Sequence, residues 1–134
     1  MTGDKPVAND ARSRLPNIFP CLIYNDSHAA IAWLEKAFGF EKHVVYPGPD
    51  GSVVHAELKL GVGMIMLGSG KEGSGLVRSP QMIYVAVENS DALFDRAKAA
   101  GAEVVRELAD TDYGSRDFAV RDPEGNVWNF GTYL

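Results

Sequence analysis

The sequence contains little of what several classes of protein require. It has a single cysteine, Cys21, among 134 residues, so no disulfide can form within the chain. Cys21 lies in an apolar run, which favours a small buried residue over a catalytic nucleophile. No stretch approaches the roughly 20 consecutive apolar residues of a membrane-spanning helix. Residues 1–14 lack the apolar segment of a secretory signal, so we expect a polar N-terminal tail, a cytoplasmic protein and no membrane partner.

Basic residues are also scarce. The chain has 13 Lys and Arg against 18 Asp and Glu, a formal net charge of -5. Nucleic-acid binding depends on clustered Lys and Arg that contact phosphates, and no such cluster or stripe occurs here. We therefore expect no nucleic-acid partner, and the acidic balance gives a weak preference for a cationic ligand.

What the chain does contain is a repeat. Gly39 and Gly101, each at the end of a helical pattern, lie 62 residues apart. Gly63 and Gly125, each at the start of an apolar strand, have the same spacing of 62 residues. The order of elements between them matches in both halves: a strand, a helix and three strands. The sequence therefore predicts an α+β fold made of two β-α-β-β-β modules, with the helices on the outer face and the opposite face curved around a cavity.

The patterns place the elements as follows. Helices are predicted from Asp26 or Ser27 to Gly39 and from Asn89 or Ser90 to Gly101. Strands are predicted at 17–24, 40–46, 53–60, 64–67, 81–87, 102–108, 112–120 and 126–132, with a turn at 109–111. Pro20 favours an edge position for the first strand. We expect one domain at 15–134, with modules at about 17–68 and 80–134 and a Gly/Ser-rich linker at about 69–79.

The strand at 53–60 alternates, and its two faces have different chemistry. One face carries only apolar residues, namely Val54, Ala56, Leu58 and Leu60. His55 and Glu57 lie on the other face, where they could bind a ligand or move a proton. If His43 pairs with residue 55 across the hairpin, His43, His55 and Glu57 converge; a shift of one residue separates them.

Two motifs carry a resemblance to a known family. The first is YND at the end of the first strand, followed by the helix AAIAWLEKAFGF; the second is RDPEGNVWNF near the C-terminus. With the repeat and the Gly-rich linker, they resemble the vicinal oxygen chelate superfamily. That superfamily contains glyoxalase I, extradiol dioxygenases, fosfomycin resistance enzymes and bleomycin resistance proteins. The resemblance covers about residues 17–134 and implies a curved, funnel-shaped sheet and a homodimer.

The resemblance also implies where a metal would bind. Superfamily enzymes hold a divalent metal with His, Glu or Gln from the first and last strand of each module. In this sequence those positions carry Phe19 (or Pro20), Met82, Asn129 and Leu67 (or Met66). None is a good ligand for a transition metal. We therefore expect no metal and no cofactor, and the chain is most similar to the metal-free bleomycin resistance type, which sequesters a drug in an aromatic dimer groove.

This interpretation makes the protein a small-molecule binder with no catalytic residue. An alternative is a superfamily lyase, isomerase or dioxygenase with an altered metal site, and a third is a regulatory or partner-binding module. Trp128 and Asn129 are neighbours on one strand, so strand register decides which of the two faces the ligand. The candidate ligand-binding residues are Phe19, His55, Glu57, Met66, Met82, Tyr84, Tyr113, Asp117, Trp128 and Asn129.

Overall fold

Two β-α-β-β-β modules make up the computed structural model, which describes residues 16–70 and 78–133. The first contains β1 (Cys21–Ile23), α2 (Ser27–Phe38), β2 (Glu41–Pro47), β3 (Val53–Leu60) and β4 (Gly63–Gly68). The second contains β5 (Met82–Ala86), α3 (Ser90–Ala99), β6 (Glu103–Asp110), β7 (Arg116–Arg121) and β8 (Val127–Gly131). The expected tail at 1–14 and most of the expected linker lie outside the described residues.

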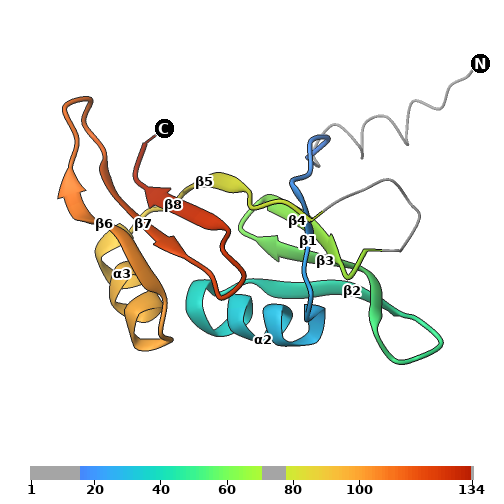
Figure 1. Cartoon of the computed structure of the whole chain (residues 1–134). Coiled ribbons are helices and arrows are strands. Elements are labelled where there is room, and N and C mark those ends of the chain that lie inside the picture. The colour runs from blue at the N-terminus through green and yellow to red at the C-terminus, as the bar shows by residue number, and fades with distance from the viewer. Residues whose placement is uncertain (1–15, 71–77, 134) are drawn as a thin grey trace, which may run out of the picture.

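Each module forms its own four-stranded mixed sheet. The strand orders are β1-β4-β3-β2 and β5-β8-β7-β6, and the β1–β4 and β5–β8 pairs are parallel. Both helices lie on the same side of the strands, and no helix of residues 16–70 and 78–133 lies on the opposite side (Figure 1). We call that side the helix-free face; strand pairing places Glu57, Met66, Tyr84 and Asn129 on it. The predicted α+β architecture and the outer position of the helices are confirmed.

Both helices begin as the sequence predicted, and α2 also ends as predicted, at Gly39. The Asp26 carboxylate accepts a hydrogen bond from the Ala29 amide at 3.1 Å, and the Asn89 side chain accepts one from the Ala92 amide at 3.0 Å. These side chains satisfy backbone donors that the first turn leaves free. Gly39 follows α2 with a φ of 85°, a left-handed conformation that glycine adopts without strain. Within the described ranges, no helix has the length and apolar character needed to cross a membrane.

The two modules share one hydrophobic core. Phe38, at the end of α2, packs against Trp128 and Phe130 of β8 with ring centroids 5.3 and 4.6 Å apart. The Trp33 indole donates a hydrogen bond to the carbonyl of Ala100 at 3.3 Å, which ties the two helices together. Burying an aromatic side chain of this size contributes about 2–3 kcal/mol. The shared aromatic residues therefore hold the two sheets in one arrangement.

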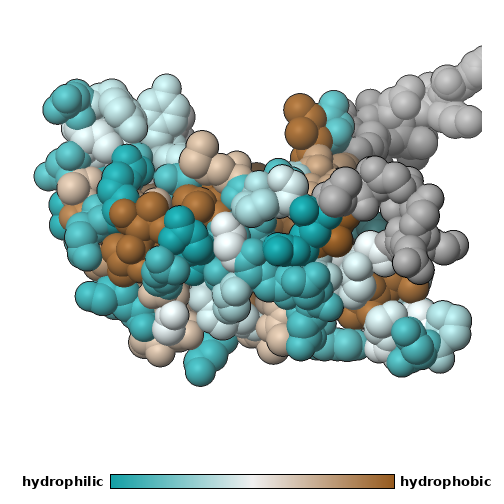
Figure 2. Space-filling view, viewed as in Figure 1, coloured by the Kyte–Doolittle hydropathy of each residue, from teal (hydrophilic) through white to brown (hydrophobic). Residues whose placement is uncertain are grey.

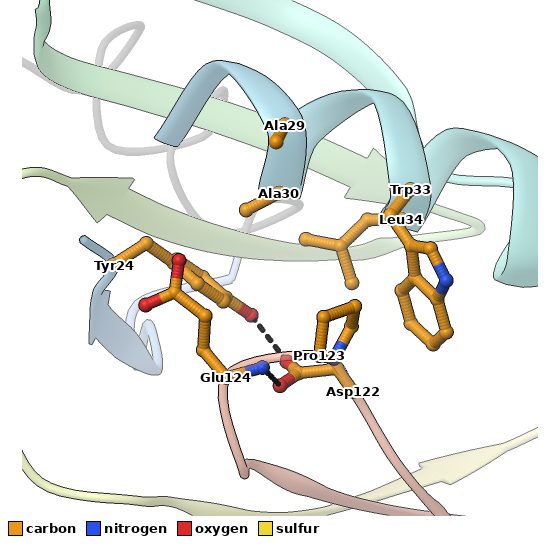
Figure 3. A pocket seen from close by; sticks show the side chains of 8 residues that line it. All are labelled: Tyr24, Ala29, Ala30, Trp33, Leu34, Asp122, Pro123 and Glu124. Carbon is orange, nitrogen blue, oxygen red and sulfur yellow. Dashed lines mark hydrogen bonds between the residues drawn. The ribbon is translucent and has the colours of Figure 1, made fainter. Parts of the chain in front are cut away.

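The DPEG turn joins the modules by hydrogen bonds. The Asp122 carboxylate is buried, and its Oδ2 accepts from the Trp128 indole at 3.1 Å and from the Tyr24 hydroxyl at 2.7 Å. Figure 3 shows the second of these hydrogen bonds. Its Oδ1 accepts from the amides of Glu124 and Asn126, both at 3.0 Å. Burial, followed by the charge of Asp122, raises the pKa of Tyr24 well above its ordinary value, so this phenol stays a donor.

Two predicted strand boundaries were wrong. The first strand is only Cys21–Ile23 instead of 17–24, and it lies at the edge of its sheet, as Pro20 favoured. The turn predicted at 109–111 lies further along, because β6 continues to Asp110 and β7 begins at Arg116. Hydrogen bonds between Thr111 and Ser115 close this turn, and Gly114 supplies a φ of 92°.

The alternation expected along β3 is interrupted at one residue. Tyr46 pairs with His55 and Pro47 pairs with Val53, so Val54 has no partner on β2. This bulge reverses the pattern: Val53 is 1% exposed and Val54 is 62% exposed, the opposite of the prediction. Beyond the bulge Ala56 and Leu58 are buried, as predicted.

The hydrogen bond between Tyr24 and Asp122 can be tested by removing one hydroxyl. We expect Tyr24→Phe to lower the free energy of unfolding by about 1–3 kcal/mol, because Asp122 then keeps a buried oxygen with one donor fewer. Urea denaturation measures the change. Tyr46→Phe is the matched control, since Tyr46 is exposed, and we expect a change below about 0.5 kcal/mol. Equal losses in the two variants would contradict the assignment.

Candidate functional site

The helix-free face carries two polar groups, one on each sheet. On the first sheet, His55 Nε2 lies 3.0 Å from Glu57 Oε2. These residues are two apart on β3, so both project from the same side of the strand. The Tyr46 ring lies beside His55 with centroids 5.9 Å apart. The pair is half-buried, so a ligand on this face could exchange a proton or a hydrogen bond with it.

The second polar group is centred on a buried carboxylate. Asp117 on β7 is 2% exposed, and its Oδ1 accepts a hydrogen bond from the Tyr84 hydroxyl at 3.2 Å. The Tyr133 amide donates to the same hydroxyl at 3.3 Å. Asp117 Oδ2 is buried and has no hydrogen-bond partner among the described residues. Desolvation raises the pKa of Tyr84, so its phenol is a donor at neutral pH.

This contact exists because residue 131 is a glycine. Gly131 pairs with Ala86 on one side and Asp117 on the other. A Cβ at position 131 would overlap the Asp117 carboxyl group and the Tyr84 hydroxyl. Tyr84 therefore reaches Asp117 across a position that carries no side chain. The corresponding residue of the first module is Gly68, where a Cβ would overlap the carbonyl oxygen of Val54.

Two hollows lie near the Tyr84–Asp117 pair, one beside Tyr84 and one lined by Asp117. One has a volume of about 340 Å³ and is lined by Tyr84, Tyr113 and Tyr133. The rings of Tyr113 and Tyr133 meet edge to face at 5.9 Å. The other has a volume of about 330 Å³, and Asp117 itself lines it beside Tyr113. The remaining lining residues of that second hollow are Arg106, Glu107, Ala109, Asp110, Thr111 and Asp112.

The positions expected to hold metal ligands are on the helix-free face or lead into it. Cys21 pairs with Met66 as Tyr84 pairs with Asn129, so Met66, and not Leu67, corresponds to Asn129. Leu67 is 3% exposed and belongs to the core. Phe19 precedes Cys21 by two residues, as Met82 precedes Tyr84, and Met82 is 76% exposed.

The side chains present do not fit a transition metal. A metal of the kind that the family holds needs three or more imidazole, carboxylate or thiolate ligands. In residues 16–70 and 78–133, no three His, Cys, Asp or Glu side chains lie close enough together to share a metal ion. Thioether, phenyl and amide groups occupy the four positions instead.

The structure excludes one alternative that the sequence left open and one of the candidate ligand-binding residues. His43 lies at a break in register, because Lys42 pairs with Leu58 and Val44 with Glu57. His43 therefore has no partner on β3, and the pairing that would bring it opposite His55 is absent. Trp128 is fully buried against Phe38 and Phe40, so it does not line the helix-free face. Its neighbour Asn129 takes that face because successive residues alternate.

His55, Glu57 and Asp117, all candidate ligand-binding residues from the sequence, do not form one cluster. The first two contact each other on one sheet, and Asp117 contacts Tyr84 on the other; no hydrogen bond joins the two groups in the part of the chain that the structure describes.

Sequence reasoning missed Tyr46, Tyr133 and Gly131. Tyr46 and Tyr133 stand next to turns and outside clear alternation, so only the bulge and the strand ends place them.

The cavity in Figure 3 is not the candidate site. It has a volume of about 160 Å³ and lies between α2 and the DPEG turn, on the helix side of the molecule. Ala29, Ala30 and Leu34 supply mainly apolar walls, and the polar group at its base, Asp122, already accepts hydrogen bonds at both oxygens. We interpret it as a packing gap between the modules.

Comparison with known proteins agrees with this geometry. Residues 16–130 match the family model of the glyoxalase/bleomycin resistance protein/dioxygenase superfamily. The chain belongs to this superfamily. An uncharacterized protein of Mycobacterium bovis is 35% identical over 125 residues, covering 87% of this chain and 82% of the relative. An uncharacterized protein of Mycobacterium tuberculosis is also 35% identical over 125 residues, and that match covers 87% of this chain and 74% of the relative.

Solved structures of the superfamily share the fold. TioX from Micromonospora sp. ML1 is 32% identical, with a TM-score of 0.79 over 89% of this chain and 99% of that protein. The fosfomycin resistance protein FosX of Listeria monocytogenes, solved with Mn(II), has a TM-score of 0.62 at 18% identity, covering 87% of this chain and 88% of its own. The likeness to FosX shows the fold alone.

The glycine beneath Tyr84 is testable by adding one methyl group. We expect Gly131→Ala to break the hydrogen bond between Tyr84 and Asp117 and to cost about 1–3 kcal/mol in unfolding free energy, through overpacking. Urea denaturation gives the energy, and the NMR signals of the Tyr84 ring report the local change. Gly63→Ala is the control, because a Cβ there meets only the Leu60 carbonyl at 3.4 Å. An unchanged Tyr84 spectrum in Gly131→Ala would contradict the geometry.

Proposed function

We propose that this protein binds a flat, aromatic small molecule on its helix-free face, without a metal, and acts by sequestration. The observation that carries the proposal is the chemistry of the four positions where the superfamily holds its metal. Phe19, Met66, Met82 and Asn129 stand there, and none is a transition-metal ligand of the usual kind. Apolar and thioether side chains favour an apolar ligand surface instead.

Aromatic side chains on the same face support this ligand class. Tyr84, Tyr113 and Tyr133 line one hollow, and all three are partly exposed. Rings that remain in contact with solvent can stack on a flat ligand and bury a large area on binding. The superfamily to which the chain belongs includes bleomycin resistance proteins, and we propose a resistance role of that general kind for this chain.

We further propose that the ligand lies in a groove between two copies of the chain. Met82 and Tyr46 are large side chains that remain 76% and 56% exposed on the helix-free face. Each sheet also ends in open edge strands, such as β2 and β6, whose backbone groups a second copy could cover. A dimer that faces this side inward would shield both features and enclose the ligand.

The proposed lack of a metal is tested by elemental mass spectrometry on protein purified without a chelating tag. We expect less than about 0.1 metal ion per chain, not raised by added Ni²⁺, Zn²⁺, Mn²⁺ or Fe²⁺, because three suitable ligands do not converge. One metal per chain or per dimer would overturn the proposal. Sedimentation velocity of the same sample measures the oligomeric state, and a monomer at tens of micromolar would remove the dimer groove.

Aromatic binding is tested with neutral, flat compounds such as phenazine and acridone. We expect Met82→Ala and Tyr84→Ala each to weaken binding about tenfold, because each removes surface that a stacked ring would cover. Val62→Ala is the control, since Val62 is exposed in the turn between β3 and β4. Isothermal titration calorimetry measures the affinities. Equal effects of all three variants would argue against binding on this face.

One observation favours a second function, that of a metal-independent superfamily enzyme. The His55–Glu57 pair is half-buried, and a carboxylate that orients an imidazole in this way is the geometry of a general base. An enzyme of this kind would lose turnover in His55→Ala while keeping its ligand affinity. If His55→Ala leaves every measured turnover intact, the catalytic version fails and the binding proposal is unaffected.

A further inference from the structure

Asp117 is a buried carboxylate whose partners are incomplete. Its side chain is 2% exposed, Oδ1 accepts one hydrogen bond from Tyr84, and Oδ2 has no partner among the described residues. An ionised carboxylate has about four acceptor sites, and a buried oxygen without a donor costs free energy. Unsatisfied buried groups are rare in native proteins, and a bound partner is one reason to keep such a group. The hydrogen bonds that Asp117 lacks are those that a bound donor would supply.

The side chains around Asp117 indicate which kind of donor would bind there. Tyr84, Tyr113 and Tyr133 come from three different segments, namely β5, the β6–β7 turn and the residues after β8, and their rings border one hollow. A hollow walled by several aromatic rings attracts a cation through the negative faces of the rings. Tyr84 belongs to both features, because its ring lines the hollow while its hydroxyl bonds to Asp117.

The neighbouring hollow, which Asp117 lines, also carries a net negative charge. Four carboxylates line it, those of Glu107, Asp110, Asp112 and Asp117, together with the guanidinium of Arg106. Asp110 is already paired with Arg116 at 3.2 Å, so its charge is left out of the count for this hollow. Glu107, Asp112 and Asp117 then leave the hollow negative even after Arg106 is counted. A negative, partly desolvated hollow raises the local concentration of cations and disfavours anionic ligands.

We propose that the ligand carries a positively charged nitrogen, an amine or amidine attached to its aromatic part, and that Asp117 Oδ2 accepts a hydrogen bond from it while the three tyrosines surround the charge. This deepens the proposed binding function and rests on it. Because Oδ2 is shielded from solvent, a neighbouring side chain must move when the ligand binds. Tyr113 lines both hollows and can rearrange around the ligand, since it is 63% exposed and stands beside Gly114 in the turn.

The test compares two probes that share the naphthylmethyl group and differ in the polar group attached to it: 2-(aminomethyl)naphthalene carries an ammonium group at pH 7, and 2-naphthalenemethanol carries a neutral hydroxyl. NMR titration of the full chain measures both affinities. We expect the cation to bind at least about tenfold more tightly, the scale of one charge-assisted hydrogen bond. Asp117→Asn should abolish that difference. Asp112→Asn, which removes an exposed carboxylate of the same hollow, should keep most of it.

A second readout separates ligand binding from a structural role. If Asp117 supports the fold, Asp117→Asn lowers the urea midpoint; if it is kept for a ligand, the midpoint stays the same or rises. Should Asp117→Asn fail to fold, the carboxyl ¹³C signal of Asp117 in the unaltered protein serves instead. That signal should shift with the amine and not with the alcohol.

The outcomes distinguish this inference from the function on which it rests. If both probes bind with equal affinity and Asp117→Asn changes neither, the charge preference is wrong and the aromatic binding site stands. If neither probe perturbs the Tyr84, Tyr113 or Tyr133 signals, the proposed binding site itself fails. An Asp112→Asn variant that loses as much preference as Asp117→Asn would assign the effect to general charge and overturn the role of Oδ2.

Discussion

The arrangement of both modules depends on the buried Asp122 carboxylate. It accepts hydrogen bonds from Tyr24 of the first module and from Trp128, Asn126 and Glu124 of the second. A buried carboxylate is tolerated when its acceptor sites are filled, and here both oxygens are used. The same turn presents the Glu124 carboxylate to the amides of Asn25 and Asp26 at the start of α2. The DPEG motif, which carries the family resemblance, is therefore a structural joint between modules.

Because Asp122 fixes the start of β8, it also fixes which residues of β8 face each way. Trp128 donates to Asp122 and enters the core, so Asn129 takes the helix-free face and Phe130 returns to the core. Gly131 then lies between Ala86 and Asp117, where the missing side chain leaves room for Tyr84. The candidate site on the second sheet thus follows, residue by residue, from one buried hydrogen-bonded turn.

The repeat preserves backbone requirements and lets the helix-free face diverge. Gly68 and Gly131 occupy matching places at the ends of β4 and β8, and both exclude a Cβ. The matching positions His55 and Asp117 carry different chemistry: a half-buried imidazole paired with Glu57, and a buried carboxylate bonded to Tyr84. Core packing and turn geometry constrain the shared positions, whereas only a ligand or a partner constrains the face. Two modules of one fold can therefore supply two different halves of a site.

The sequence by itself determined the modules, the helices and the order of strands, because capping residues, positive-φ glycines and the repeat spacing are local properties of the chain. It also narrowed the residues at the expected metal-ligand positions, with Phe19 or Pro20 left open at one position and the choice between Met66 and Leu67 left open at another. Only the tertiary structure decided that choice, the bulge at Val54 and the separation of His43 from His55, because each depends on register between strands distant in sequence. The hydrogen bond between Tyr84 and Asp117 was likewise decided in three dimensions: it spans 33 residues and crosses a glycine on a third strand.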